Sequence, residues 1–432
     1  MPEVLWLLSY TPAYRFVRFQ SRFRMSKQCI IVGGSHAGAQ VAISLRQEGW
    51  EDNILVISNE SYLPYHRPPL SKGFVSGDKT LDDILLRPAT YFEKHNVKFA
   101  LNTNVDSINR ELKQIQTSDG ETRNYSKLAL TTGARVRKIA IPGSDLQGIH
   151  YLRSAADAQA IQADAITAKH AVIVGGGYIG LELAASFRKA GMNVTVLEMA
   201  PRVLARVAAP KVADFYTRVH REEGVSIVTE ASAESFAGKQ RVEAVQATDG
   251  KNYPADIVII GVGVIPNTEL ASDAGLHVDN GIVVNKFAQT SDPNIVAAGD
   301  CTYHPNALLG RRLRLESVPN ATEQGKTAAA SLCGNQKPYS SLPWFWSDQF
   351  DLKLQIAGFN EGYDQVVLRG DSTSSRSMAA FYLKENKVIA VDCINRAQEF
   401  AVVKKALTKG LAIRIEDLAD ESIKPKDLLV TA

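Results

Sequence analysis

The chain has 432 residues, enough for two or three domains with buried cores, and its composition is that of an ordinary globular protein. Its formal net charge of +3 lies entirely in the first 24 residues, which hold four arginines against Glu3. The remainder is neutral, which disfavours a nucleic-acid-binding protein, and no apolar run approaches the roughly 18 residues of a membrane-spanning helix.

Residues 1–24 are rich in arginine and poor in acids, which is compatible with an organellar transit peptide or with a start codon placed upstream of a true start at Met25. We leave this segment out of the fold. The four cysteines form no CxxC or CxxxxC pair, and the eight histidines show no ligand spacing. We therefore expect reduced thiols in a cytoplasmic protein without membrane association, and no metal site.

The first predicted element is an apolar strand that runs into a glycine turn and a helix, CIIVGGSHAGAQVAI at 29–43. At such a turn, backbone N–H groups and the positive end of the helix meet the phosphates of a dinucleotide. Gly33 and Gly38 hold the outer glycine positions, but Ser35 replaces the middle glycine. The second strand, NILVIS, ends on Ser58 rather than on an acid. The stretch predicts an imperfect dinucleotide site.

A second copy of the pattern, AVIVGGGYIGLELAA at 171–185, is complete: Gly175, Gly177 and Gly180 form G-x-G-x-x-G between a strand and a helix over 181–190. The next strand, NVTVLE, ends on Glu198, 23 residues after Gly175, where an acid binds the ribose 2′-hydroxyl and disfavours a 2′-phosphate. The register indicates an NADH site rather than a mere tight turn. Two unlike sites favour an enzyme in which one nucleotide stays bound and the other exchanges.

Two short β-rich runs, LALTTGA at 128–134 and IVAAGD at 295–300, each end in a glycine turn. Asp300 could accept hydrogen bonds from a ribityl chain, although each run alone is more typical of an ordinary strand-to-loop turn. Near the C-terminus, SMAAFYLKENKVIAVDCIN predicts a β-hairpin, followed by a helix over 397–409 that ends at Gly410.

Six stretches carry a family resemblance that covers nearly everything from Met25 onward. They are YHRPPLSK (65–72), GGGYIGLE (175–182), PRVLARV (201–207), NIVAAGD (294–300), ESVPNATEQG (316–325) and PWFWSDQFDLKLQIAG (343–358). In them the chain resembles the FAD-dependent ferredoxin reductases of bacterial oxygenase systems, of the putidaredoxin reductase type. The resemblance implies an α/β, glutathione-reductase-like fold with two Rossmann-like dinucleotide-binding domains and a C-terminal α+β domain.

The resemblance also implies how the domains divide the chain. An FAD-binding domain would comprise 25–131 and 263–345, an NADH-binding domain 132–262, and the C-terminal domain 346–432. FAD would occupy the first turn and NADH the second. Residues around FAD would be Gly33, Ser35, Ala37, Gly38, Asn59, Lys72, Val105, Arg153, Asp300 and Val318, and those around NADH Gly175, Gly177, Tyr178, Ile179, Gly180 and Glu198.

Related enzymes that reduce disulfides carry a CxxxxC pair facing the flavin, but the corresponding stretch here, RPPLSKGF, has no cysteine. Electrons must therefore leave the flavin directly, which fits hydride uptake from NADH followed by single-electron steps to an iron–sulfur protein. The resemblance places Lys72 and Glu182 as a catalytic ion pair beside flavin N5, where the ammonium stabilises negative charge on the reduced ring. Taken without the resemblance, Lys72 is a solvated lysine and Glu182 a routine helix acid.

The expected partner is a [2Fe–2S] ferredoxin that feeds an aromatic-ring dioxygenase or a haem monooxygenase. Trp344 and Trp346 are candidates for the contact edge near the flavin, or else anchors of a domain junction. Arg311, Arg312 and Arg314 form a basic cluster that could steer an acidic ferredoxin, or else a solvated loop. Rubredoxin reductase, NADH oxidase and a DNA-binding flavoprotein of the apoptosis-inducing-factor type stay open as alternatives, and the oligomeric state stays unassigned.

Overall fold

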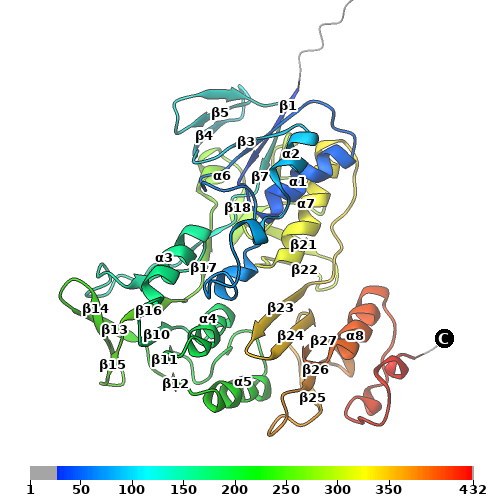
Figure 1. Cartoon of the computed structure of the whole chain (residues 1–432). Helices are drawn as coiled ribbons and strands as arrows, with labels where there is room; N and C mark the ends of the chain where they lie inside the picture. The colour runs from blue at the N-terminus through cyan, green and yellow to red at the C-terminus, as the bar shows by residue number, and fades with distance from the viewer. Residues whose placement is uncertain (1–26, 431–432) are drawn as a thin grey trace, which may run out of the picture.

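The computed structural model describes residues 27–430, and the expectations for residues 1–24 fall outside this range. Two five-stranded parallel sheets and one five-stranded antiparallel sheet, each with its own helices, form the body of the molecule (Figure 1). The predicted fold class, α/β with two Rossmann-like units and a C-terminal α+β unit, is confirmed. Within 27–430, no helix combines the length and the apolar composition needed to cross a membrane.

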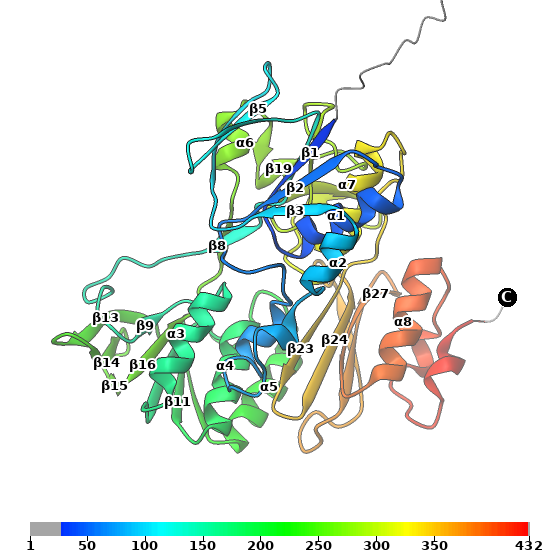
Figure 2. The same ribbon diagram turned by 45° about the horizontal axis from the view of Figure 1, so that its top comes forward.

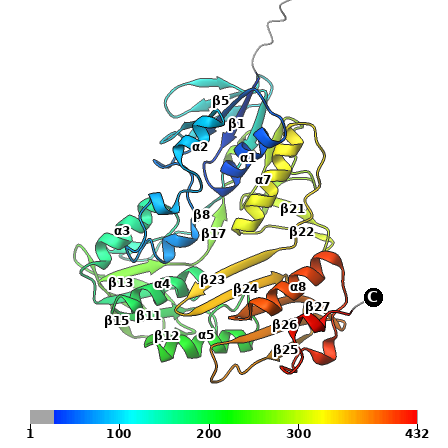
Figure 3. The ribbon, with the colours of Figure 1, turned by 45° about the vertical axis from the view of Figure 1, so that its right-hand side comes forward.

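The first parallel unit is built from two separate parts of the chain. Its elements are β1 (Gln28–Val32), α1 (His36–Gln47), β2 (Asn53–Ile57), two short 3-10 turns (Pro68–Ser71 and Asp82–Ile84), α2 (Ala89–Lys94), β3 (Val97–Ala100), β4 (Val105–Asn109), β5 (Gln114–Thr117), β6 (Thr122–Asn124), β7 (Lys127–Leu130), α6 (Glu269–Asp273), β20 (Ile295–Ala297) and α7 (Val318–Leu332). The strand order is β20-β7-β1-β2-β3, all parallel. The strands are nearly continuous apolar runs because both faces of the sheet are covered. Helices α1 and α7 lie side by side on one face (Figure 3), and α6 with the small sheet β4-β5-β6 covers the other.

The second parallel unit lies between the two parts of the first in sequence. Its elements are β9 (Ile149–His150), α3 (Ala155–Ala165), β10 (His170–Val174), α4 (Tyr178–Lys189), β11 (Asn193–Glu198), α5 (Pro210–Glu222), β12 (Val225–Thr229), β13 (Ala233–Gly238), β14 (Val242–Ala247), β15 (Asn252–Pro254) and β16 (Ile257–Ile260). The order is β12-β11-β10-β16-β9, again all parallel. Helices α4 and α5 pack on one face, and the sheet β13-β14-β15 packs on the other.

The helix predicted over 181–190 begins three residues earlier, because Gly177 is its N-cap and Gly180 already lies in its first turn. Two crossings join the parallel units, and their strands β8 (Ala134–Val136) and β17 (Val264–Pro266) pair antiparallel (Figure 3). A four-stranded sheet follows the second crossing, with β18 (Val278–Asp279), β19 (Gly281–Val283), β21 (Thr302–Asn306) and β22 (Arg311–Leu313).

The C-terminal unit is an antiparallel sheet with different helices on its two faces. Its elements are β23 (Trp344–Gln349), β24 (Leu352–Gly358), β25 (Gln365–Arg369), β26 (Met378–Lys384), β27 (Lys387–Ile394), α8 (Ala397–Lys409) and two 3-10 turns (Ile415–Asp417 and Pro425–Leu428). The predicted hairpin is β26–β27, and the predicted helix is α8, which ends at Gly410 in the left-handed conformation. The sheet stands between α4 and α5 on one side and α8 on the other (Figure 2).

Candidate active site

The first glycine turn connects β1 to α1. Gly33 has φ of +108°, and a Cβ on Gly38 would lie 1.9 Å from the Gly33 carbonyl oxygen, so neither position accepts a side chain without rearrangement. Ser35 is the N-cap of α1, but its side chain makes no capping hydrogen bond. The N–H groups of the first helical turn, which includes the buried Ala37, therefore keep their capacity to bind an anion.

A network that the sequence did not predict occupies the space beside this turn. Arg67 donates from Nε to Ser35 Oγ at 2.9 Å, forms an ion pair with Glu60, and donates to the Arg153 carbonyl oxygen. Tyr65 donates to the other carboxylate oxygen of Glu60. Sequence reasoning missed Arg67, although it lies within the stretch YHRPPLSK that carried part of the family resemblance. The network ties the turn to the loop that follows β2.

Two predicted FAD residues from distant parts of the chain meet near this network. Arg153 forms an ion pair with Asp300 across 3.0 Å, and Asp300 follows Gly299, whose φ is +89°. Three further predicted residues lie on different elements: Asn59 follows β2, Val105 begins β4 and Val318 begins α7. No hydrogen bond found within residues 27–430 joins Asn59, Val105 and Val318 to one another.

His36, the first residue of α1, adds an unsatisfied group to the first turn. Its side chain is buried, and its Nε2 has no hydrogen-bond partner among the described residues. Burial, with the nearby Arg67, His66 and Arg153, lowers the pKa of His36 to about 3. An unpaired ring nitrogen at an uncapped helix start is compatible with a ligand that supplies the missing hydrogen bond.

The second glycine turn connects β10 to α4 and is more open than the first. Gly175 has φ of +112°, and a Cβ on Gly180 would lie 2.2 Å from the Gly175 carbonyl oxygen. Gly177, the N-cap, faces free space, because a Cβ there would have no atom within 4 Å. That space is where a pyrophosphate approaches the backbone at such turns. Ile179, also predicted at this site, is 46% exposed.

Glu198 ends β11 and lies directly at the second turn. Its Oε2 accepts from the Gly176 N–H at 2.7 Å, and its Oε1 accepts from the Ala200 N–H at 2.8 Å. Both bonds come from backbone groups and hold the carboxylate in one orientation, and no arginine or lysine of residues 27–430 forms an ion pair with it. This is the arrangement expected of an acid that hydrogen-bonds a ribose hydroxyl.

Lys72 and Glu182 meet where the two parallel units touch. Lys72 Nζ lies 2.6 Å from Glu182 Oε2 and also donates to the Pro68 carbonyl oxygen at 3.1 Å. Glu182 lies on α4, one turn after the second glycine turn, and its side chain is 3% exposed, against 22% for Lys72. Ser71 Oγ donates to the same Glu182 oxygen at 2.5 Å. The ion pair that the resemblance implied is thus present, with its ammonium partly open and its carboxylate buried.

The residues predicted for partner docking divide between two environments. Trp344 and Trp346 stack on one another with ring centroids 5.4 Å apart, and Lys404 Nζ of α8 lies 4.1 Å from the Trp344 ring centroid. The three arginines lie on or next to β22, and each has a partner. Arg311 pairs with Glu361, Arg314 with Glu316, and Arg312 donates to two backbone carbonyl oxygens, of Val284 and Tyr303.

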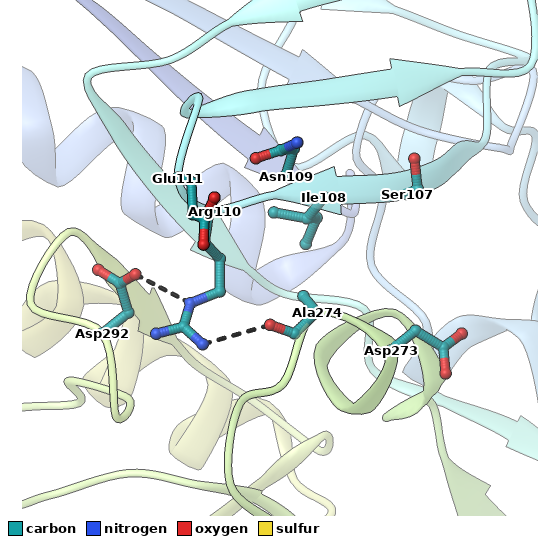
Figure 4. A pocket seen from close by; sticks show the side chains of 8 residues that line it. All are labelled: Ser107, Ile108, Asn109, Arg110, Glu111, Asp273, Ala274 and Asp292. Atoms are coloured by element: carbon teal, nitrogen blue, oxygen red, sulfur yellow. Dashed lines mark hydrogen bonds and ion pairs between the residues drawn. The ribbon is translucent and has the colours of Figure 1, made fainter.

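A surface pocket lined by residues 107–111, Asp273, Ala274 and Asp292 is separate from all of these residues; Figure 4 shows its lining. It has a volume of about 670 Å³ and lies between β4 and α6, where Arg110 pairs with Asp292 across 3.0 Å. It contains none of the predicted site residues. No cluster of three or more histidine, cysteine, aspartate or glutamate side chains in the described part of the chain could hold a metal ion.

Comparison with known proteins identifies the family. Residues 27–325 match the pyridine nucleotide-disulphide oxidoreductase family, and residues 344–429 match the reductase C-terminal family. The chain is 43% identical to putidaredoxin reductase of Pseudomonas putida over 409 residues, which cover 93% of this chain and 97% of that protein. It is 39% identical to the ferredoxin reductase subunit of the 5,5′-dehydrodivanillate O-demethylase of a Sphingobium species, over 93% of this chain and 98% of that protein.

A solved structure agrees with these relatives. The crystal structure of the covalent putidaredoxin reductase–putidaredoxin complex aligns with a TM-score of 0.90 and 43% identity, covering 93% of this chain and 98% of that chain. The predicted resemblance and the predicted cofactors, FAD and NADH, are confirmed. The chain belongs to the pyridine nucleotide-disulphide oxidoreductase family and is an FAD- and NAD(H)-dependent oxidoreductase.

Proposed function

We propose that this protein is an NADH:ferredoxin oxidoreductase that supplies electrons to an oxygenase through a [2Fe–2S] ferredoxin. The Lys72–Glu182 pair carries the proposal, because it joins the segment RPPLSKGF to the helix of the second nucleotide turn at a place where disulfide reductases have cysteines. FAD, when bound, accepts two electrons as hydride and releases them singly. The similarity to reductases named for ferredoxin-type acceptors supports ferredoxin as the acceptor.

For FAD we propose the first parallel unit, residues 25–131 and 263–345. Uncapped N–H groups at the start of α1, the close approach at Gly38 and the unpaired Nε2 of His36 fit a bound pyrophosphate. Arg67 would fix the Ser35 hydroxyl beside it, and the Arg153–Asp300 pair would face the ribityl chain. We keep the remaining predicted FAD contacts, Asn59, Val105 and Val318, as part of this proposal.

For NADH we propose the second parallel unit, residues 132–262, with residues 346–432 as the C-terminal domain. The free space at Gly177 and the N-terminus of α4 fit the pyrophosphate, and Glu198 would accept a hydrogen bond from the ribose 2′-hydroxyl. A 2′-phosphate in the same place would meet the negative charge of this carboxylate, which forms no ion pair with an arginine or lysine among the described residues. The site therefore favours NADH over NADPH.

Lys72 would act electrostatically in this enzyme. Its ammonium, held by Glu182 and by the Pro68 carbonyl oxygen, would stabilise negative charge that develops next to it. No side chain has to abstract a proton, since hydride transfer needs no base. The positive charge is fixed in place before the reaction, so little reorganisation is needed during it.

For the ferredoxin we propose contact at Trp344 and Trp346, next to Lys404. The arginine cluster of β22 is a weaker candidate for ferredoxin contact. Glu316 and Glu361 neutralise two of its charges, and Arg312 donates hydrogen bonds to backbone carbonyl oxygens. We further propose a cytoplasmic enzyme, because the four cysteines are free thiols.

The test is NADH-driven reduction of cytochrome c, with and without an added acidic [2Fe–2S] ferredoxin. We expect the rate to depend strongly on the ferredoxin. NADH oxidation at the same rate without ferredoxin, with hydrogen peroxide accumulating, would indicate an oxidase and contradict the proposal. Replacing the ferredoxin with rubredoxin in a third sample checks the alternative acceptor, because a higher rate with rubredoxin would overturn the assignment.

A further inference from the structure

The buried carboxylate of Glu182 receives a third donor from the C-terminal unit. Lys72 and Ser71 both contact Oε2, whereas Ser347 Oγ of β23 donates to Oε1 at 2.6 Å. Ser347 is fully buried and lies 165 residues from Glu182 in sequence. The ion pair between the two nucleotide units is therefore also tied to the third unit of the molecule.

One face of β23 makes this contact possible. Side chains alternate along a strand, so Phe345, Ser347 and Gln349 share the face opposite to Trp344 and Trp346. Phe345 packs on Tyr178 at the start of α4, with ring centroids 5.0 Å apart. The same face therefore lies against the helix that carries Glu182.

Gln349 and His220 fix the direction of the hydrogen bond from Ser347. His220 of α5 is buried, and burial lowers its pKa to about 4, so its imidazole is neutral at pH 7. Its Nε2 lies 2.8 Å from Gln349 Oε1, an atom that can only accept, so Nε2 carries the hydrogen. The Gln349 amide nitrogen then donates to Ser347 Oγ at 3.1 Å.

This order leaves the Ser347 hydroxyl hydrogen free to point at Glu182. Each bond in the series His220–Gln349–Ser347–Glu182 sets the polarity of the next, and the series runs from α5 through β23 to α4. Nδ1 of His220 has no hydrogen-bond partner among the described residues, but each of the three bonds that lead from its Nε2 to Glu182 is made. A buried series of bonds with fixed directions rigidifies the group at its end. The group at its end is the carboxylate that holds Lys72.

We propose that Ser347 and Gln349 are positioning residues that orient Glu182 and thereby fix the Lys72 ammonium beside the flavin. This inference rests on the proposed function, since it takes Lys72 to act at the flavin. Without Ser347, Glu182 Oε1 loses its donor, and the carboxylate is free to turn about its terminal bond. The Lys72 ammonium would then move with the Glu182 carboxylate and leave its position beside the flavin. No residue in contact with the cofactor would have been changed.

Three holoenzyme variants test the proposal. Ser347→Ala removes the donor to Glu182, Ser347→Thr keeps a hydroxyl, and Gln349→Met removes the amide at similar volume. Tyr382→Phe is the matched control, because Tyr382 is buried in the same interface and bonds to Asp392 and the Ala209 N–H, but not to Glu182. Lys72→Ala gives the size of the full effect.

Two measurements are made without ferredoxin: the rate of flavin reduction by NADH in stopped flow, and the FAD reduction potential by equilibration with a reference dye. We expect Ser347→Ala and Gln349→Met to slow reduction about tenfold and to make the potential more negative, toward the values of Lys72→Ala, with the NADH dissociation constant unchanged. Ser347→Thr should restore both quantities. Tyr382→Phe should lower the melting temperature and leave both unchanged.

An unchanged rate and potential in Ser347→Ala and Gln349→Met would overturn the proposal. A shift of the same size in Tyr382→Phe would also overturn it, because the effect would then be general loosening of the interface. Failure of the proposed function is distinguishable: wild-type enzyme would then reduce its flavin with NADH but pass no electrons to ferredoxin, an outcome that these two measurements do not involve.

Discussion

The two glycine turns have nearly the same backbone and very different surroundings. At the first, the serine in the middle of the motif accepts a hydrogen bond from Arg67, which also pairs with Glu60 and binds the Arg153 backbone. At the second, the middle glycine faces free space, and the acid Glu198 is held by backbone N–H groups alone. One turn is enclosed by side chains from several loops, and the other is open.

This difference matches the two roles that a flavin-dependent dehydrogenase needs. A cofactor that stays bound dissociates more slowly when the side chains around it are hydrogen-bonded to one another, because its release must then break several bonds together. A cofactor that must leave after each turnover exchanges faster at an exposed site, where one contact is enough to distinguish it from other nucleotides. We therefore expect changes at the first turn to affect FAD retention and changes at the second to affect NADH binding. Three experiments test that division, and a fourth provides a structural reference.

The largest effects should follow from an alanine at the last glycine of each motif. In Gly38→Ala and Gly180→Ala the new Cβ would meet a carbonyl oxygen of its own turn at 1.9 and 2.2 Å. Such overpacking costs about 1–3 kcal/mol and displaces the backbone that meets the phosphates. We expect Gly38→Ala to purify without flavin absorbance, and Gly180→Ala to keep its flavin but to lose reduction by NADH. Loss of flavin from both would remove the distinction between the turns.

A smaller effect is expected from Arg67→Met. The variant loses the bonds to Ser35, Glu60 and the Arg153 carbonyl. Hydrogen bonds of charged groups contribute up to about 1.5–3 kcal/mol each, and less for partly exposed side chains such as Arg67. FAD should therefore dissociate at least tenfold faster, measured by the recovery of free flavin fluorescence, with unchanged NADH affinity. Arg202→Met is the matched control near the second turn, where Arg202 donates to the Ala205 carbonyl. Equal FAD release from both variants would contradict the assignment.

Glu60 follows the first motif and Glu198 follows the second. Replacing each with glutamine should affect a different cofactor. Glu198→Gln keeps the size of the side chain but weakens its hydrogen bond to a ribose hydroxyl, so the NADH dissociation constant should rise about tenfold, or about 1.4 kcal/mol. Its preference for NADH over NADPH should fall in parallel. Glu60→Gln should leave both unchanged and promote FAD release instead. Isothermal titration with each nucleotide measures the constants, and an NADH effect in Glu60→Gln would count against the division.

Asp392→Asn should change neither turn and serves as the reference for a purely structural effect. Burial raises the pKa of Asp392 from 3.8 to about 7, opposed by the hydrogen bond from Tyr382. The folded state therefore keeps this proton between about pH 4 and 7 while the unfolded state has lost it, so stability falls as pH rises through that window. Wild type should lose on the order of 2 kcal/mol between pH 5.5 and 8.0 from this group, and Asp392→Asn should not. Urea denaturation at the two pH values measures the difference, and parallel losses would refute the assignment.

Much of the local structure was predictable because its causes are local. The turns at 33–38 and 175–180, the strands that precede them and the acid at 198 follow from glycine sterics and strand-to-helix spacing. The hairpin at 378–394 and the stop of α8 at Gly410 follow from side-chain alternation and from the left-handed conformation that glycine accepts. The start of α4 was predicted three residues too late, because Gly180 was taken as part of a loop although it lies inside the helix.

The contacts between segments far apart in the sequence could not be predicted from local patterns. The Lys72–Glu182 pair came from the family resemblance and not from the spacing of the two residues. The role of Arg67 was not predictable from its neighbours in sequence, because Ser35 and Glu60, which it contacts, lie 32 and 7 residues away from it. The arginines at 311, 312 and 314 looked like a basic cluster in sequence, but each finds an acid or a carbonyl oxygen close by in space.

By itself, therefore, the sequence determined two dinucleotide turns, the acid that follows the second of them and the absence of a redox disulfide, since each depends on residues within about 25 positions of one another. Only the tertiary structure decided which side chains surround the first turn and which strand contacts the Lys72–Glu182 ion pair. Ser347 reaches Glu182 across 165 residues because α4 and β23 pack together. Such packing depends on the burial of whole faces, which no short stretch of sequence encodes.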